Sequence, residues 1–174
     1  MTEITYRVAT PADSRALAEL RYTFRTSLGE AAESRAEFLE RCTDWMRDRL
    51  NGRSWLAWLA VQGAAPVGCV WLQPIEKIPN PVVEPELHSY ITNFYVVPEL
   101  RERGIGHELL RMAVEWCHAQ QVDSVILWPT EQSRSLYERH GFAARNALME
   151  LRLGISGQAT ALRSDDTRTG GASP

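Results

Sequence analysis

The chain has 174 residues, of which 44% are hydrophobic and 24% charged, and its formal net charge is -3. This length holds one domain with a substantial core and is too short for two ordinary domains. The mildly acidic balance argues against a nucleic-acid-binding protein, because such proteins carry a basic patch or domain. No apolar run approaches the roughly 18 residues of a membrane span, and the first ten residues lack the regions of a signal peptide. We therefore expect a cytoplasmic protein with no membrane partner.

The first half of the chain predicts a strand, two helices and a hairpin. Thr10, Pro11 and Asp13 mark a helix start, with Thr10 as the N-cap and proline at the first helical position. The second helix carries an apolar stripe and ends before Gly52. Two apolar, aromatic-rich runs follow, as in a hairpin. These elements cover about residues 4–8, 10–24, 33–50, 55–61 and 67–72.

The second half predicts strands that alternate with helices. Four prolines between residues 73 and 89 predict an irregular loop, and a long ordered loop is often functional. The expected strands cover residues 90–97 and 125–128, with one or two more within 142–153, and the expected helices cover 104–121 and 133–139. Residues 154–174 are polar and rich in glycine, which predicts a disordered tail after a single domain of residues 1–153.

This order predicts an α/β fold of the α+β type. The economical arrangement is a mixed central β-sheet of about six to seven strands flanked by about four helices. Strand 90–97, helix 104–121 and strand 125–128 should form a right-handed crossover between parallel strands.

Cysteine and histidine usage points away from disulfides and metals. Cys42, Cys69 and Cys117 lie among apolar residues without C-x-x-C spacing, which predicts buried, reduced thiols. The 4 histidines show no metal-ligand spacing, so we expect no metal site.

A glycine-containing loop from Arg101 to Gly106 lies between a predicted strand and a predicted helix. The first amides of a helix lack partners and, with the helix dipole, attract anions. Gly104 and Gly106 let the backbone approach a bulky phosphate, and the arginines add positive charge. A tight turn with solvated arginines explains the same residues, and a bare G-x-G favours that simpler interpretation. A dinucleotide-binding loop is disfavoured, because Leu109 stands where its third glycine belongs.

The surrounding residues resemble a known family. Residues 93–110 combine a strand, Val97-Pro98 and then arginine-x-x-glycine-x-glycine opening a helix, which closely resembles the acetyl-CoA-binding segment of the GNAT superfamily of N-acetyltransferases. Residues 135–142 resemble the second signature of that family, Leu-Tyr-Glu-x-x-Gly-Phe, at the expected distance. The resemblance spans about residues 2–153 and is specific after residue 90. It implies splayed central parallel strands and an enzyme that uses acetyl-CoA as co-substrate.

The resemblance also implies which residues hold acetyl-CoA. Backbone groups of the splayed strand would pair with the pantetheine arm, and amides of residues 103–108 would bind the pyrophosphate. The side chains of Arg103 and His107 would assist, although an exposed helix start explains His107 equally well. The implied cofactor-binding residues are Tyr95, Val96, Val97, Arg101, Arg103, Gly104, Ile105, Gly106, His107, Glu108 and Thr130.

Tyr137 matches the family tyrosine that lies near the cofactor sulfur. Attack of an amine on a thioester releases a thiolate, which a phenol with a reference pKa of about 10 can protonate as a general acid. A packing role is the alternative. Two positions depart from the family pattern: Thr130 stands where many members carry an asparagine, and strand 124–128 lacks the glutamate base of some members. His88 or Glu86 in the proline-rich loop is then the candidate base, although solvated loop residues explain both.

The acceptor is expected to be an amine of a small molecule or of a protein or peptide, and a homodimer is left open. In the family, the acceptor approaches between the first helical pair and the loop before the central strand. Glu76, Glu84 and Glu86 in that loop favour a cationic acceptor such as a polyamine, an amino sugar or a lysine-like amine, although such loops are often simply polar.

Four tryptophans have two possible locations. They either belong to the core, the commoner case at these spacings, or line an apolar pocket; they are Trp45, Trp55, Trp58 and Trp71.

The predicted function is acetyl transfer from acetyl-CoA to a primary amine by direct attack in a ternary complex. A non-catalytic acyl-CoA-binding or sensing module with the same fold is the alternative, and a nucleotide-binding regulatory domain is a third possibility.

Overall fold

The computed structural model describes residues 3–144 and 148–151. The chain divides into two compact units, Met1–Phe142 and Ala143–Pro174. The helices and strands of the described residues all lie in the first unit, and the predicted tail of residues 154–174 lies outside the described residues. In chain order the elements are β1 (Ile4–Val8), the 3-10 helix η1 (Pro11–Asp13), α1 (Ser14–Thr26), α2 (Arg35–Asn51), β2 (Leu56–Gln62), β3 (Ala65–Glu76), β4 (Leu87–Val96), the 3-10 helix η2 (Pro98–Leu100), α3 (Ile105–Ala119), β5 (Ser124–Ile126) and α4 (Glu131–Arg139).

The helices on the N-terminal side begin at capping residues. Thr10 is the N-cap of η1, as predicted, and its amide donates a 2.7 Å hydrogen bond to the Asp13 carboxylate. Ser34 caps α2, because its hydroxyl accepts a 3.3 Å hydrogen bond from the amide of Glu37 while its own amide donates to the Glu37 carboxylate. Such reciprocal bonds satisfy amides that a helix start leaves without partners.

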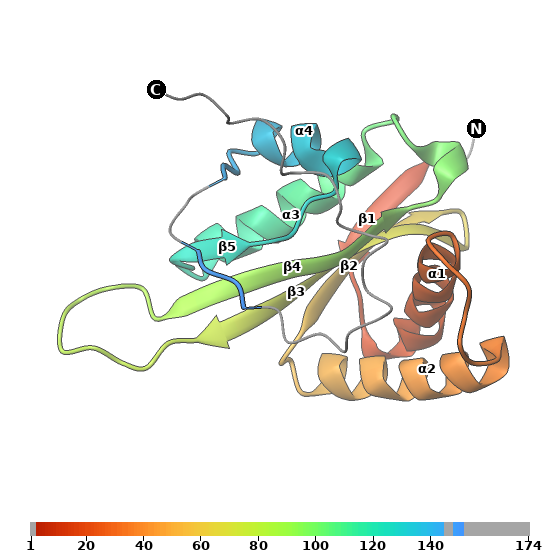
Figure 1. The fold of residues 1–174 in the computed structure, drawn as a ribbon, viewed down its shortest axis with the longest axis horizontal. Helices are drawn as coiled ribbons and strands as arrows, with labels where there is room; N and C mark the ends of the chain where they lie inside the picture. Colours follow the sequence, from red (N-terminus) through yellow and green to blue (C-terminus); the bar gives the residue numbers. More distant parts are fainter. Residues whose placement is uncertain (1–2, 145–147, 152–174) are drawn as a thin grey trace, which may run out of the picture. The chain divides into compact units, whose positions relative to one another are not determined.

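The strands of the described residues form one mixed sheet in the order β1-β2-β3-β4-β5 (Figure 1). Neighbouring strands are antiparallel from β1 to β4, and β5 joins β4 in parallel after the α3 crossover. The expected mixed sheet and the four flanking α-helices are confirmed in the described part of the chain, where the sheet has five strands rather than six or seven.

The strands expected within residues 142–153 do not form at the described positions. Residues 142–144 and 148–151 belong to no strand, and the remaining positions of that range lie outside the described residues. Leu148, Met149 and Leu151 are exposed, so their apolar side chains do not share the buried face that a sheet strand would provide.

The hairpin of β3 and β4 is longer than the sequence predicts. The range 73–89 was expected to be irregular, yet β3 continues to Glu76 and places Pro74 opposite Ser89 of β4. β2 pairs with β3 only as far as Leu72, so one edge of β3 is free beyond that residue. A proline is tolerated there because no ladder hydrogen bond is lost on a free edge. The loop proper is therefore residues 77–86, which extends away from the sheet (Figure 1).

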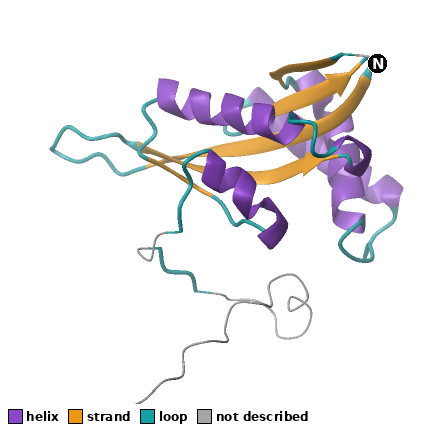
Figure 2. Cartoon of the chain, turned by 90° about the horizontal axis from the view of Figure 1, so that it is seen from above, coloured by secondary structure: helices purple, strands orange, loops and turns teal. Residues whose placement is uncertain are grey.

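Two hydrophobic clusters cover the two faces of the sheet. α1 and α2 pack on one face around Leu17, Leu39 and Trp71, while α3 packs on the other around Leu109 and Leu110. Figures 1 and 2 show this three-layer arrangement, with α3 and α4 on the face opposite α1 and α2. The central strands are thus buried from both sides, as in other sheets covered by helices on both faces.

β4 and β5 separate soon after they pair. Only three residue pairs connect them, from His88 opposite Ser124 to Tyr90 opposite Ile126, whereas β4 pairs with β3 along its whole length. The splay implied by the family resemblance is therefore present. Among the described residues, no strand pairs with this edge of β4 over residues 91–96, which we call the open segment.

The predicted states of the cysteines are confirmed: Cys42, Cys69 and Cys117 are buried and free. No helix in the described part of the chain has the length and apolar character needed to cross a membrane.

Candidate active site

A β-bulge interrupts β4 at the start of the open segment. Trp71 pairs with Thr92 and Cys69 pairs with Tyr95, so two residues of β4 lie opposite one residue of β3. Asn93 takes the left-handed conformation, with a φ of 46°. The extra residue breaks the alternation of side chains, so that the neighbours Thr92 and Asn93 both line a cavity on the α1 and α2 side.

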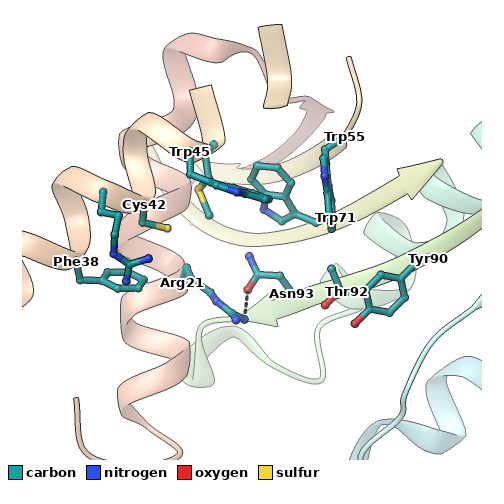
Figure 3. Close-up of a pocket in the computed structure, with 11 residues that line it drawn as sticks. Arg21, Phe38, Cys42, Trp45, Trp55, Trp71, Tyr90, Thr92 and Asn93 are labelled. Atoms are coloured by element: carbon teal, nitrogen blue, oxygen red, sulfur yellow. Dashed lines mark hydrogen bonds between the residues drawn. The ribbon is translucent and has the colours of Figure 1, made fainter. Parts of the chain in front are cut away.

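This cavity has a volume of about 500 Å³ and lies between α1, α2 and the strands β3 and β4. Figure 3 shows its lining, with three indole rings on one side and Arg21 bonded to Asn93 on another. The lining residues are Arg21, Phe38, Arg41, Cys42, Trp45, Met46, Trp55, Trp71, Tyr90, Thr92 and Asn93.

Three of the four tryptophans form an aromatic wall of this cavity. The ring centroids of Trp45 and Trp55 are 5.5 Å apart, and those of Trp45 and Trp71 are 6.1 Å apart. Trp58 packs instead in the cluster under α3. The sequence left open whether these tryptophans belong to the core or line a pocket, and the fold places Trp58 of β2 on the α3 face and the other three at the cavity.

The charges that line the cavity are positive. Arg21 is half-buried and Arg41 exposed, and no aspartate or glutamate belongs to the lining as described. Burial lowers the pKa of Arg21, and the neighbouring Arg25 lowers it further. The acidic loop that favoured a cationic acceptor does not reach this cavity: Glu84 pairs with Lys77 and accepts a hydrogen bond from Asn80.

The sequence did not identify Arg21, Arg41, Phe38 or Cys42 as site residues. Phe38, Cys42 and Trp45 were expected on one apolar stripe of the second helix, and they do share a side of α2. One sequence signal could have identified this site. Arg41 is close to Phe38 and Trp45 at helical spacing, and an arginine is unusual beside a helix face that only packs in a core.

The predicted phosphate loop presents free amides at the start of α3. Gly104 is the N-cap with a φ of 81°, a conformation that residues with a Cβ rarely adopt. The first helical hydrogen bond runs from Glu108 N to Gly104 O at 3.0 Å, and no side chain caps the helix. The amides of Ile105, Gly106 and His107 are therefore the unpartnered donors of the first turn. Together with the helix dipole they form an anion-binding position.

The backbone of the open segment is only partly free. Val97 donates its N–H to Val67 O at 2.9 Å, its carbonyl accepts a bond from an amide of η2 at 3.1 Å, and Tyr95 pairs with β3. The carbonyl of Val96 lies on the free edge and accepts a 3.1 Å hydrogen bond from Nε of Arg101. Tyr95, Val96 and Val97 were predicted to pair with the pantetheine arm. Of these three, Val96 has a backbone carbonyl that a ligand can reach once the side chain of Arg101 is displaced.

Other predicted loop residues have partners of their own. His107 and His140 lie together, with 2.9 Å between Nδ1 of His107 and Nε2 of His140, which connects the first turn of α3 to the C-terminal end of α4. Glu108 pairs with Arg111, which holds the pKa of Glu108 below its usual value. Arg103 is exposed beside the turn.

Tyr137 is buried on α4 beside the open segment. Its ring centroid lies 6.0 Å from that of Phe94 and 5.8 Å from that of Phe142. Burial raises the pKa of its phenol to about 12, and the hydroxyl of Ser133 partly offsets this effect. The phenol is therefore protonated throughout the neutral range.

Thr130 is the N-cap of α4. Its hydroxyl lies 3.0 Å from Oγ of Ser133, and its amide donates to the same oxygen at 2.9 Å. A capping role accounts for a threonine at this position, and Ser133 links the cap to the phenol of Tyr137.

The two candidate bases lie at the hairpin end of β4. His88 belongs to the strand rather than to a loop, and its Nδ1 lies 2.8 Å from Oγ of Ser124 where β4 and β5 are still paired. Glu86 is exposed in the loop. Neither lines the cavity, so the geometry gives no support to either residue as the base.

Comparison with known proteins decides the family. The profile of the acetyltransferase (GNAT) family matches residues 16–142. The chain belongs to this family. A GCN5-related N-acetyltransferase from Ralstonia eutropha is 27% identical, with a TM-score of 0.70 over 87% of this chain and 100% of that one. No curated protein sequence gives a significant match.

Two more distant structures share the fold. One is a predicted acetyltransferase from Clostridium acetobutylicum solved with acetyl-CoA, which is 21% identical with a TM-score of 0.73 over 87% of this chain and 97% of that one. The other is glucosamine-6-phosphate N-acetyltransferase from Arabidopsis thaliana, which is 15% identical with a TM-score of 0.65 over 87% of this chain and 99% of that one.

The family membership makes the chain an acyltransferase with acetyl-CoA as co-substrate. Two observations show that the residues of this chain are suited to binding acetyl-CoA. The start of α3 offers uncapped amides to a pyrophosphate, and the open segment of β4 offers a free edge to an amide-containing arm. Within residues 3–144 and 148–151, no group of three or more His, Cys, Asp or Glu is placed to hold a metal ion.

Proposed function

We propose that this acetyltransferase transfers the acetyl group to a primary amine by direct attack in a ternary complex, with Tyr137 as the general acid. One observation carries the proposal: the buried phenol of Tyr137 packs against Phe94 of the open segment, on the same strand whose bulge borders the cavity. Tyr137 and the cavity that can hold an acceptor therefore lie on opposite faces of β4, next to its open segment.

The same geometry supports a proposed binding mode for the co-substrate. The amides of Ile105 to His107 and the side chain of Arg103 bind the pyrophosphate, and the free edge at Val96 pairs with the pantetheine arm after Arg101 moves aside. Gly104, Gly106 and Glu108 shape this turn, and Thr130 contributes by fixing the start of α4. When bound, acetyl-CoA supplies an activated carbonyl carbon and a thiolate leaving group.

Each residue then has a defined task. Asn93 and Thr92 border the position of the attacking amine, and the C–N bond forms as the C–S bond breaks. Tyr137 donates its phenolic proton to the sulfur, the amine releases a proton to solvent through the cavity, and Tyr137 regains a proton from solvent before the next turnover. The described lining contains no carboxylate or histidine that could act as the base, so a water molecule or a backbone carbonyl accepts the proton of the amine.

A cytoplasmic location and a small-molecule acceptor fit this mechanism. The three free thiols are those of a protein in a reducing compartment, and a cavity of about 500 Å³ matches a small molecule.

The test is release of free thiol from acetyl-CoA with a panel of amines, using the full chain and Tyr137→Phe. We expect turnover with at least one amine and a rate lower by about 10²–10⁴ in the variant, the usual contribution of a general acid. CoA should raise the melting temperature of both proteins, since a ligand that binds the native state stabilises it.

The outcomes separate the alternatives. A melting temperature raised by CoA without turnover of any amine would indicate the non-catalytic acyl-CoA-binding module. Turnover that is unchanged in Tyr137→Phe would refute the acid assignment and leave the acetyltransferase activity standing.

A further inference from the structure

The cavity beside the bulge has the size and position of an acceptor site. Its volume of about 500 Å³ lies in the range of roughly 300–1,000 Å³ that is typical of small-molecule pockets. Tyr90, Thr92 and Asn93 line it from β4, at the point where that strand loses β5 as a neighbour. A molecule in the cavity therefore lies directly beside the open segment.

Arg21 places a positive charge in this cavity without a carboxylate to balance it. Its Nη1 donates a 3.2 Å hydrogen bond to the neutral Oδ1 of Asn93, and among the described residues it forms no ion pair. Arg41, by contrast, is exposed and pairs with Glu33. A half-buried charge is costly unless a partner compensates it, so the cavity favours a ligand with a negative charge.

The single uncompensated positive charge of Arg21 matches the single negative charge of a carboxylate. A guanidinium binds a carboxylate through two parallel N–H···O bonds, and a phosphate dianion would exceed the single uncompensated charge of Arg21. A cationic polyamine would meet Arg21 and Arg41 as like charges.

The hydrogen bond between Arg21 and Asn93 limits the shape of the ligand. Asn93 stands at the bulge, so a carboxylate bound by Arg21 lies next to the strand at which the amine must react. Only a short link between carboxylate and amine fits this arrangement. The rest of the ligand faces the wall of Trp45, Trp55 and Trp71, whose rings lie 5.5 to 6.3 Å apart and accept an apolar group.

We propose that the acceptor is a free amino acid with an apolar side chain of aromatic size. Arg21 binds its carboxylate, the three indoles pack against its side chain, and its amine faces the open segment. The orientation of the amine rests on the proposed function, whereas binding in the cavity does not depend on turnover.

Binding is measured by the fluorescence of the cavity tryptophans. The full chain, with and without saturating CoA, is titrated with L-phenylalanine, with phenethylamine, which lacks the carboxylate, and with L-phenylalaninamide, in which it is neutral. We expect saturable binding of L-phenylalanine that is about 10- to 100-fold tighter than that of the other two, the range of a charge-assisted hydrogen-bonded pair.

Variants test the role of Arg21. Arg21→Gln should weaken the binding of L-phenylalanine by about 10- to 100-fold, and it should not weaken the binding of phenethylamine, because a like charge is removed. Arg21→Lys should fall between the unaltered chain and Arg21→Gln, because it keeps the charge without the planar fork. Arg15→Gln is the matched control, since Arg15 is exposed on the same helix and does not line the cavity. Thermal unfolding of each variant shows whether it is folded, and the ligand comparison in the unaltered chain needs no variant.

The outcomes distinguish this inference from the proposed function. Arg21-dependent binding of L-phenylalanine without thiol release supports the carboxylate-binding cavity and refutes the transfer of the acetyl group to this amino acid. Thiol release with spermidine or phenethylamine, at equal or better affinity than L-phenylalanine, overturns the inference and retains the transfer. Absence of saturable L-phenylalanine binding, or equal binding by Arg21→Gln, also overturns it.

Discussion

Arg21 of α1 donates a hydrogen bond to Asn93 of β4 across 72 positions of the sequence, with 3.2 Å between Nη1 and Oδ1. Asn93 has a φ of 46° at the bulge, so its side chain leaves the strand at an angle that an extended residue would not give. The bond ties the helix that borders the cavity to the strand segment that loses its neighbour. The shape of the cavity thus depends on Asn93 in its left-handed conformation and on the half-buried cation of Arg21.

We predict that Asn93→Ala destabilises the fold more than Asn93→Gly. Both variants lose the hydrogen bond to Arg21, but only alanine meets the left-handed backbone with a Cβ, which costs about 1–2 kcal/mol. The free energy of unfolding from guanidinium titrations should therefore differ by about 1 kcal/mol between the two variants. Equal destabilisation would show that the positive φ contributes nothing to the stability of the bulge.

Gly104 and Gly106 should respond differently to alanine. A Cβ at Gly104 meets open space but a φ of 81°, whereas a Cβ at Gly106 meets Leu136 and Phe94 at 3.4 and 3.5 Å, which are ordinary contacts. Gly104→Ala should lower the free energy of unfolding by about 1 kcal/mol. It should also weaken the binding of CoA, because the turn that orients the first amides of α3 becomes strained. Gly106→Ala should keep both stability and affinity, as measured by thermal unfolding with and without CoA. If Gly106→Ala were the more damaging change, the strain argument for Gly104 would be wrong.

The sequence predicts well those elements whose signals are local. Helix 104–121 is observed as Ile105–Ala119 and helix 33–50 as Arg35–Asn51, because Gly104 and Ser34 specify helix starts through their own conformation and hydrogen bonds. The loop and Tyr137 were located for the same reason, as short motifs in their expected elements.

The rest depends on contacts between distant residues. The cavity needs Arg21 of α1, an aromatic wall from α2, Trp55 and β3, and a bulge in β4, and these parts are far apart in the sequence. The extension of β3 through Pro74 was also hidden, because a proline is unfavourable in a strand unless its edge is free, and the free edge is a property of the whole sheet.

Asp13 should stabilise the fold through its ionised form. Hydrogen bonds from Arg7, both at 2.7 Å, and from Thr10 hold the pKa of this carboxyl well below its usual value. A lowered pKa gives stability that is present above the unfolded pKa of about 3.9 and is lost as the pH falls below it. We predict that Asp13→Ala lowers the free energy of unfolding by about 1–2 kcal/mol at pH 7, with a smaller difference below pH 3 or so.

Asp44→Ala is the control for Asp13. Asp44 forms an exposed i,i+3 pair with Arg47 at 2.7 Å, and pairs of this kind contribute about 0–0.5 kcal/mol. Urea titrations of both variants between pH 3 and 7 make the comparison. If the loss of unfolding free energy in Asp13→Ala did not change with pH, the effect of Asp13 would come from helix capping and not from its ionised charge.

The His107 and His140 pair should make stability depend on pH near neutrality. Burial lowers the pKa of His140, and the charges of His107 and Arg139 lower it further. The neutral form is thus favoured in the folded state, so its stabilisation is present above about pH 6.5 and is lost as the pH falls. His140→Gln should flatten the decline of melting temperature between pH 7 and 5, whereas His118→Gln, an exposed change on α3, should leave it as steep as in the unaltered chain. Parallel declines in all three proteins would exclude the pair as the cause.

Tyr137→Phe should separate catalysis from packing. The phenylalanine ring keeps the contacts with Phe94 and Phe142 and loses only the hydroxyl, so the folded state should change little while kcat falls by about 10²–10⁴. Tyr6→Phe is the control, because Tyr6 is a partly buried tyrosine of β1 outside the site.

The pH profile of Tyr137 catalysis gives a second readout. Burial raises the pKa of Tyr137 to about 12, so the proton donor stays intact through pH 10 and kcat/KM should show no descending limb from this group in that range. A descending limb near pH 9 that disappears in Tyr137→Phe would mean that the bound co-substrate brings the phenol much closer to its ordinary pKa, and a variant with full kcat would leave Tyr137 as a packing residue only.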